Sequence, residues 1–104
     1  MSADAPNTYE RLKVRYPQLL EAVEQLGEAA KAAGPLEPRQ AHLIQLAAAT
    51  AARSEAGVHS HTRRALKAGA TADEVRHALL LLISTVGFPQ VVAALTWAED
   101  VIGE

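Results

Sequence analysis

The chain has 104 residues, of which 49% are apolar and 4% aromatic, with a formal net charge of −2 and no cysteine. This length predicts a single domain over residues 1–104. The near-neutral charge argues against non-specific binding to nucleic acid or to an anionic membrane. The absence of cysteine excludes disulfides, thiolate metal sites and a cysteine nucleophile, and it fits the cytoplasmic location that we expect.

The N-terminal segment has no basic stretch followed by an apolar one, so we expect no signal peptide and interpret residues 1–6 as a flexible tail. The longest fully apolar run, residues 78–83, is far shorter than the roughly 20 residues that a membrane-spanning helix needs. We therefore expect no association with a membrane.

Apolar residues recur at helical spacing along the chain, and no segment shows the alternation typical of a strand. A first short helix is predicted from residues 7–8, and Pro17 suits the first turn of a second helix. The pair 34–35 ends that helix, the pair 37–38 begins a third, and a break over residues 54–57 precedes a fourth. The sequence therefore predicts an all-α bundle of about six helices.

The fifth helix is predicted to be the most apolar element. Thr71 and Glu74 form a capping box at its start, and we expect the helix to extend over residues 72–86. Because residues 78–83 are all apolar, every face of this helix should be buried, either by the same chain or by a neighbouring subunit. A sixth helix should follow from Pro89.

Several segments between residues 36 and 101, about two thirds of the chain, form a combination that is more specific than any one of them alone. They are Leu43-Ile44-Gln45-Leu46-Ala47, His61-Thr62-Arg63-Arg64-Ala65-Leu66-Lys67-Ala68-Gly69-Ala70-Thr71, Glu74-Val75, Gly87-Phe88-Pro89, Ala94-Leu95 and Trp97-Ala98-Glu99. Together they resemble the carboxymuconolactone decarboxylase family, which includes the alkylhydroperoxidase D-like proteins. The resemblance implies an all-α, alkylhydroperoxidase D-like bundle that is an obligate oligomer, a homotrimer or homohexamer, with its active site at subunit contacts.

The cysteine pair of the family's thiol members is missing. In those members two cysteines precede the motif histidine, and the corresponding positions here are Ser54 and Gly57, with His61 as the motif histidine. The family's acidic residue corresponds to His42. Because a serine hydroxyl cannot reduce a peroxide, we expect no thiol peroxidase activity. The pattern is closer to the decarboxylase (lyase) members, which use no cysteine pair, metal or organic cofactor.

His61 is interpreted as a general acid or base, because imidazole can both accept and donate a proton near neutral pH. Gly57 lies one helical turn before it and would leave space for a small ligand. The alternative is a histidine that stabilises the fold. His42 is a candidate partner or a structural residue, and it can meet Ser54 or His61 only if the turn after Arg53 folds back.

Three residues around the break before the fourth helix are further candidates. Glu55 is either a second proton-transfer group or a carboxylate that complements the helix N-terminus. Ser54 is interpreted as the N-cap of this helix and, by its position, as a substrate contact. Arg53 belongs to a basic cluster that either attracts a carboxylated substrate or forms a solvated face.

No metal site is predicted from the histidines. His59 and His61 lie two residues apart on a helix, so they do not converge on one ion, whereas helical zinc ligands are typically four residues apart. The sequence therefore favours a cofactor-free enzyme that uses histidine acid–base chemistry on a small carboxylated or carbonyl compound. The alternative is a non-catalytic small-molecule-binding or assembly protein on the same scaffold.

Overall fold

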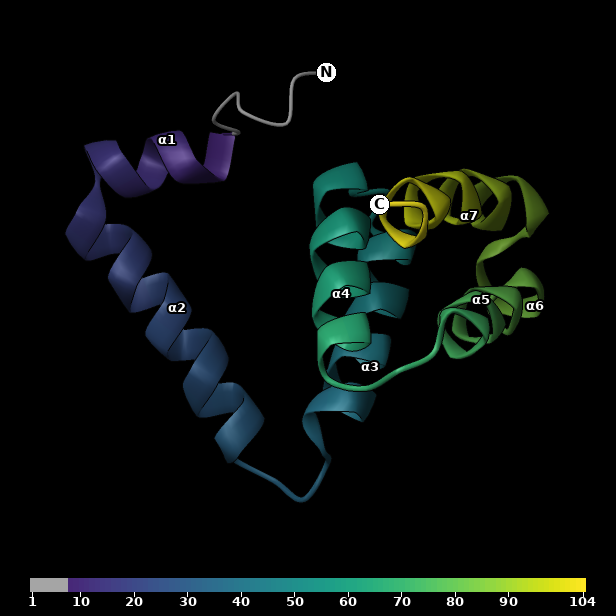
Figure 1. Cartoon of the computed structure of the whole chain (residues 1–104), viewed down its shortest axis with the longest axis horizontal. Coiled ribbons are helices and arrows are strands. Elements are labelled where there is room, and N and C mark those ends of the chain that lie inside the picture. The colour runs from purple at the N-terminus through teal and green to yellow at the C-terminus, as the bar shows by residue number, and fades with distance from the viewer. Residues whose placement is uncertain (1–7) are drawn as a thin grey trace. The chain divides into compact units, whose positions relative to one another are not determined.

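The computed structural model describes residues 8–104, and every regular element in this range is a helix, which confirms the predicted all-α fold. Contacts divide the chain into two compact units, Met1–Pro35 and Leu36–Glu104. None of the helices in residues 8–104 is long and apolar enough to cross a membrane. The helices are α1 (Thr8–Arg15), α2 (Pro17–Ala32), α3 (Pro38–Ala51), α4 (Glu55–Lys67), α5 (Ala72–Leu80), α6 (Ile83–Val86) and α7 (Phe88–Ile102) (Figure 1).

The first unit is a pair of helices, α1 and α2. Pro17 occupies the first turn of α2, as predicted, since its missing N–H has no partner there in any case. Glu24 on α2 accepts a hydrogen bond from the Tyr9 hydroxyl at 2.6 Å and forms an ion pair with Lys13 at 3.2 Å. Polar contacts of exposed side chains thus contribute to holding the two helices together.

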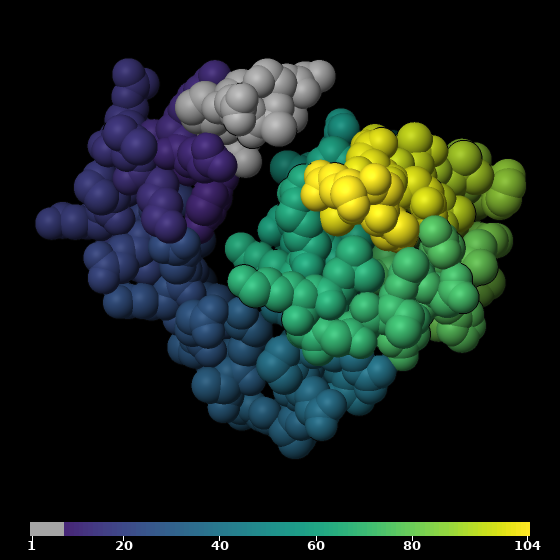
Figure 2. Space-filling view, in the orientation of Figure 1, coloured from purple at the N-terminus to yellow at the C-terminus, as the bar shows by residue number. Residues whose placement is uncertain are grey.

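The second unit is built on a hairpin of α3 and α4, which pack against each other more extensively than any other pair of helices. Helix α7 packs on α4 and α5, and its C-terminal end lies against α4 (Figure 2). Two alanines of α7, Ala94 and Ala98, are fully buried in this packing. The buried core consists of Leu46, Val58, Ala65, Ala70, Val75, Leu79, Val91, Ala94 and Ala98.

A strained turn joins α3 to α4. Arg53 adopts a left-handed backbone conformation with φ of 57°, which residues other than glycine and asparagine rarely use. Gln90 on α7 stabilises the same turn, because its side-chain amide donates to the carbonyl oxygens of Thr50 and Ala51, both at 2.9 Å. The chain therefore folds back sharply at Arg53, and α4 runs alongside α3.

The prediction of a single fifth helix over residues 72–86 is wrong, because the chain forms two helices, α5 and α6, over that segment. The helix breaks at residues 81–82, and this change of direction lets Leu82 and Val86 pack against the core. Leu80 and Leu81 remain 47% and 61% exposed in the protomer. The capping box of Thr71 and Glu74 at the start of α5 is confirmed, with both reciprocal hydrogen bonds present.

Candidate functional site

Two histidines from neighbouring helices meet in the second unit. His42 on α3 is 5% exposed, and His61 on α4 is half-buried. Their Nδ1 atoms lie 3.4 Å apart, and the ring centroids are separated by 5.7 Å with an interplanar angle of 32°. The sequence left open whether these residues meet, and the turn at Arg53 is what brings them together.

The His42–His61 contact restricts which of the two Nδ1 atoms can carry a hydrogen. At 3.4 Å one Nδ1 can carry the hydrogen and donate, while the other accepts through its lone pair. Two imidazolium rings at this distance would repel each other, so a first proton on the pair opposes the binding of a second. The geometry is therefore suited to hold and transfer a single proton.

Gly57 lies one turn before His61, but its missing side chain does not open a cavity. A Cβ atom at Gly57 would lie 2.9 Å from the Ala49 Cβ and 2.9 Å from the Ser54 Oγ. The glycine is thus explained by the close approach of α3 and α4. Ser54 caps α4 as predicted, because its hydroxyl oxygen accepts a hydrogen bond from the Gly57 N–H at 3.0 Å.

Arg53 lies beside a cavity rather than beside the histidine pair. The cavity measures about 390 Å³, a size suitable for a small ligand, and Gln90 and Trp97 also line it. Neither His42 nor His61 is among the residues that line it. Arg53 is therefore a candidate for binding a carboxylate at this cavity, separate from the imidazoles. The remaining lining residues are Val86, Pro89 and Ala93.

Residues 17–100 match the sequence model of the carboxymuconolactone decarboxylase family. The chain belongs to this family. Comparisons with curated proteins and with solved structures found no match. The match confirms the resemblance carried by residues 36–101 and extends it into α2. Membership in the carboxymuconolactone decarboxylase family supports a decarboxylase-like or related function at the family level.

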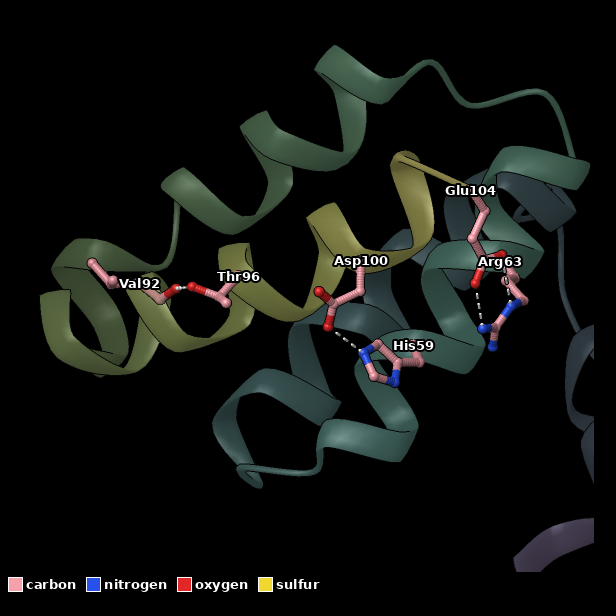
Figure 3. A network of polar contacts seen from close by, with 6 residues as sticks. All are labelled: His59, Arg63, Val92, Thr96, Asp100 and Glu104. Atoms are coloured by element: carbon pink, nitrogen blue, oxygen red, sulfur yellow. Dashed lines mark hydrogen bonds and ion pairs between the residues drawn. The ribbon is translucent and has the colours of Figure 1, made fainter. Parts of the chain in front are cut away.

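In this carboxymuconolactone decarboxylase family member, Glu55 does not join the histidine pair but a separate polar group. An oxygen of Glu55, a ring nitrogen of His59 and an oxygen of Asp100 all lie within 4.8 Å of one another. His59 Nε2 is 3.1 Å from Asp100 Oδ2 on α7 (Figure 3). Sequence reasoning missed this group because it considered only histidines as metal ligands. The four-residue spacing from Glu55 to His59 was a visible signal, whereas Asp100 becomes a neighbour only in the fold.

An ion pair lies next to this polar group. The Arg63 guanidinium donates to both carboxylate oxygens of Glu104, with Nη2 at 2.9 Å from Oε2, and this bidentate contact is drawn in Figure 3. The hydrogen bonds from Arg63 lower the pKa of the Glu104 carboxyl below its usual value. The charge of Arg63 is therefore already engaged by a carboxylate.

Proposed function

We propose that this protein is a cofactor-free, decarboxylase-like enzyme in which His42 and His61 form the acid–base pair. The observation that carries the proposal is the 3.4 Å contact between their Nδ1 atoms. The substrate is a small carboxylated or carbonyl compound, in keeping with the family. Thiol peroxidase activity is not part of the proposal, because Ser54 and Gly57 stand where the thiol members have cysteines.

The chemistry that suits the pair moves one proton and no electrons to or from the protein. In a decarboxylation, the bond between the substrate carbon and its carboxylate breaks, CO2 leaves, and the electron pair stays on a carbon next to a carbonyl. A proton from the imidazole pair then adds to that carbon, and the pair regains a proton from water. This sequence needs neither a metal nor an oxidant, and a positioned histidine is the usual group for such transfers.

The proposal is tested by His61→Gln, which keeps the approximate size and hydrogen-bonding capacity of the side chain. Loss of a positioned acid–base group should lower the rate with a substrate by roughly 10²–10⁴-fold, while the melting temperature changes little. His77→Gln is the matched control, because His77 is an exposed histidine on α5. Equal rates in wild type and His61→Gln would contradict the proposal.

A second candidate, a non-catalytic binding or assembly protein, is favoured by the packing around the pair. His42 is almost fully buried, and the space beside Gly57 is taken up by Ala49 and Ser54. If His61 is a structural residue, the same His61→Gln substitution should lower stability instead of activity. Its replacement leaves buried partners unpaired at a cost of about 1–3 kcal/mol, so the melting temperature of His61→Gln would fall while ligand binding stayed unchanged.

The proposal includes assembly into a homotrimer or homohexamer. Large apolar side chains on the second unit are exposed in the protomer, and a monomeric protein rarely leaves many of them together on its surface. Sedimentation at micromolar protein should show a trimer or a larger species. A single species at the protomer mass of 11.0 kDa would contradict this part. The exposed side chains include Ile44, Leu80, Leu81, Ile83 and Phe88.

A further inference from the structure

Glu55, His59 and Asp100 have the arrangement of a ligand set for a metal ion. Glu55 and His59 lie four residues apart on α4, so their side chains project from successive turns of the same face. Asp100 reaches them from α7, with His59 Nε2 and Asp100 Oδ2 at 3.1 Å. Two ligands of one tetrahedral ion are separated by roughly 3.3 Å, given metal–ligand bonds of about 2.0–2.1 Å. His59 and Asp100 are hydrogen-bonded to each other at this distance, which is also close to the separation of two ligands on one ion.

The charges of this group also favour a cation. Glu55 and Asp100 are both carboxylates, and their oxygens lie within 4.8 Å of each other although like charges repel. Among residues 8–104, no hydrogen bond or ion pair engages the Glu55 carboxylate. The neighbouring cation, Arg63, is bound to Glu104 at 2.9 Å. A divalent ion would satisfy both carboxylates together.

We propose that Glu55, His59 and Asp100 bind a divalent first-row transition-metal ion such as Zn²⁺. One imidazole nitrogen and two carboxylate oxygens are ligand types that such ions accept, with the remaining coordination positions left to water or to a small ligand. The ion would tie the first turns of α4 to the C-terminal part of α7. His59 and His61 project about 200° apart around α4, so this site is distinct from the histidine pair.

The position of Trp97 supplies a reporter for the experiment. It is the single tryptophan of the chain and lies three residues before Asp100 on α7. Tag-free protein is titrated with Zn²⁺ by calorimetry, and with Ni²⁺ or Cu²⁺ while the fluorescence of Trp97 is followed. We expect saturable binding of one ion per chain, quenching of Trp97 by Ni²⁺ or Cu²⁺, and a melting temperature that rises with the Zn²⁺ concentration.

Ligand variants decide where the ion binds. His59→Gln and Asp100→Asn should each weaken Zn²⁺ binding by at least about tenfold, the smallest change expected when a metal site loses a supporting group. His77→Gln and His61→Gln are the matched controls and should bind Zn²⁺ like the wild type. No saturable binding up to millimolar Zn²⁺ would overturn the proposal. Loss of binding in His61→Gln with retention in His59→Gln would also overturn it, because the ion would then belong to the histidine pair.

Discussion

Helix α4 carries one histidine on its side next to α3 and another on its side next to α7, and these two sides are called here the α3 flank and the α7 flank. On the flank next to α3, His61 faces the buried ring of His42, and the contact is between two imidazole nitrogens. On the other flank, His59 lies with Glu55 and Asp100, both of which are exposed carboxylates. The first histidine therefore contacts another imidazole, whereas the second lies beside two carboxylates.

This difference shows that two histidines on one helix can have separate roles, which follow from the helices on each side. The α3 flank depends on close packing, since Gly57 leaves no room for a side chain. The α7 flank depends on charge, with Arg63 and Glu104 paired beside the carboxylates of Glu55 and Asp100. Changes in packing should therefore affect the first flank, and changes in charge or pH the second.

Gly57→Ala should have the largest effect, on the α3 flank. The new methyl group would overlap the Ala49 Cβ, which is fixed to the backbone of α3, and would lower the free energy of unfolding by about 1–3 kcal/mol. Gly27→Ala is the control, because a Cβ at Gly27 in α2 meets no atom within 4 Å. Chemical denaturation followed by circular dichroism, which reports on the helices of both units, measures both variants. Equal stability of the two variants would show that the α3 flank is not closely packed.

On the buried face of α4, between the two flanks, a substitution at Thr62 is expected to stabilise the protein, in contrast to Gly57→Ala. The Thr62 hydroxyl is buried and has no hydrogen-bond partner among the described residues. Thr62→Val should therefore raise the free energy of unfolding by about 1–2 kcal/mol. Thr50→Val is the matched variant, because the buried Thr50 hydroxyl donates to the Leu46 carbonyl at 2.9 Å. Thr50→Val should instead lower the free energy of unfolding by about 0.5–1.5 kcal/mol. Stability changes of the same sign in Thr62→Val and Thr50→Val would contradict these expectations.

The α7 flank should show a smaller effect that depends on pH. Because Arg63 lowers the pKa of Glu104 in the folded protein, the contribution of this carboxylate is complete above its unfolded pKa of about 4.3 and is lost as the pH falls through the folded-state value. Glu104→Gln should thus lower the melting temperature slightly at neutral pH and not at about pH 2. A stability difference that persists in acid would show that Glu104 acts through packing instead of charge.

The helices and their caps could be predicted from the sequence because they depend on local residues. The proline at the start of α2, the Ser54 cap and the Thr71–Glu74 box each follow from a side chain bonding within a few residues. The apolar segment 72–86 predicts one helix, because it contains no glycine or proline that would mark the break between α5 and α6.

The grouping of the site residues could not be predicted, because it depends on how α3, α4 and α7 pack. The approach of His42 to His61 requires a left-handed turn at Arg53, and no glycine marks that turn in the sequence. Likewise, the sequence offers Glu55 either as a second proton-transfer group or as a carboxylate at the N-terminus of α4, and it gives no sign of the neighbours of Glu55 in the fold. The structure places it with Asp100, 45 positions further along the chain.

The most direct test of the histidine pair is an NMR pH titration of the imidazole nitrogens of all four histidines. We predict that His42 and His61 lose their protons in two separate steps, each detected at both rings, as coupled sites do. In His61→Gln, His42 should then titrate in one step, while the signals of His59 keep their wild-type course. Single-step titration of both rings in the wild type, with His42 unaffected by His61→Gln, would contradict the claim that the two histidines share a proton.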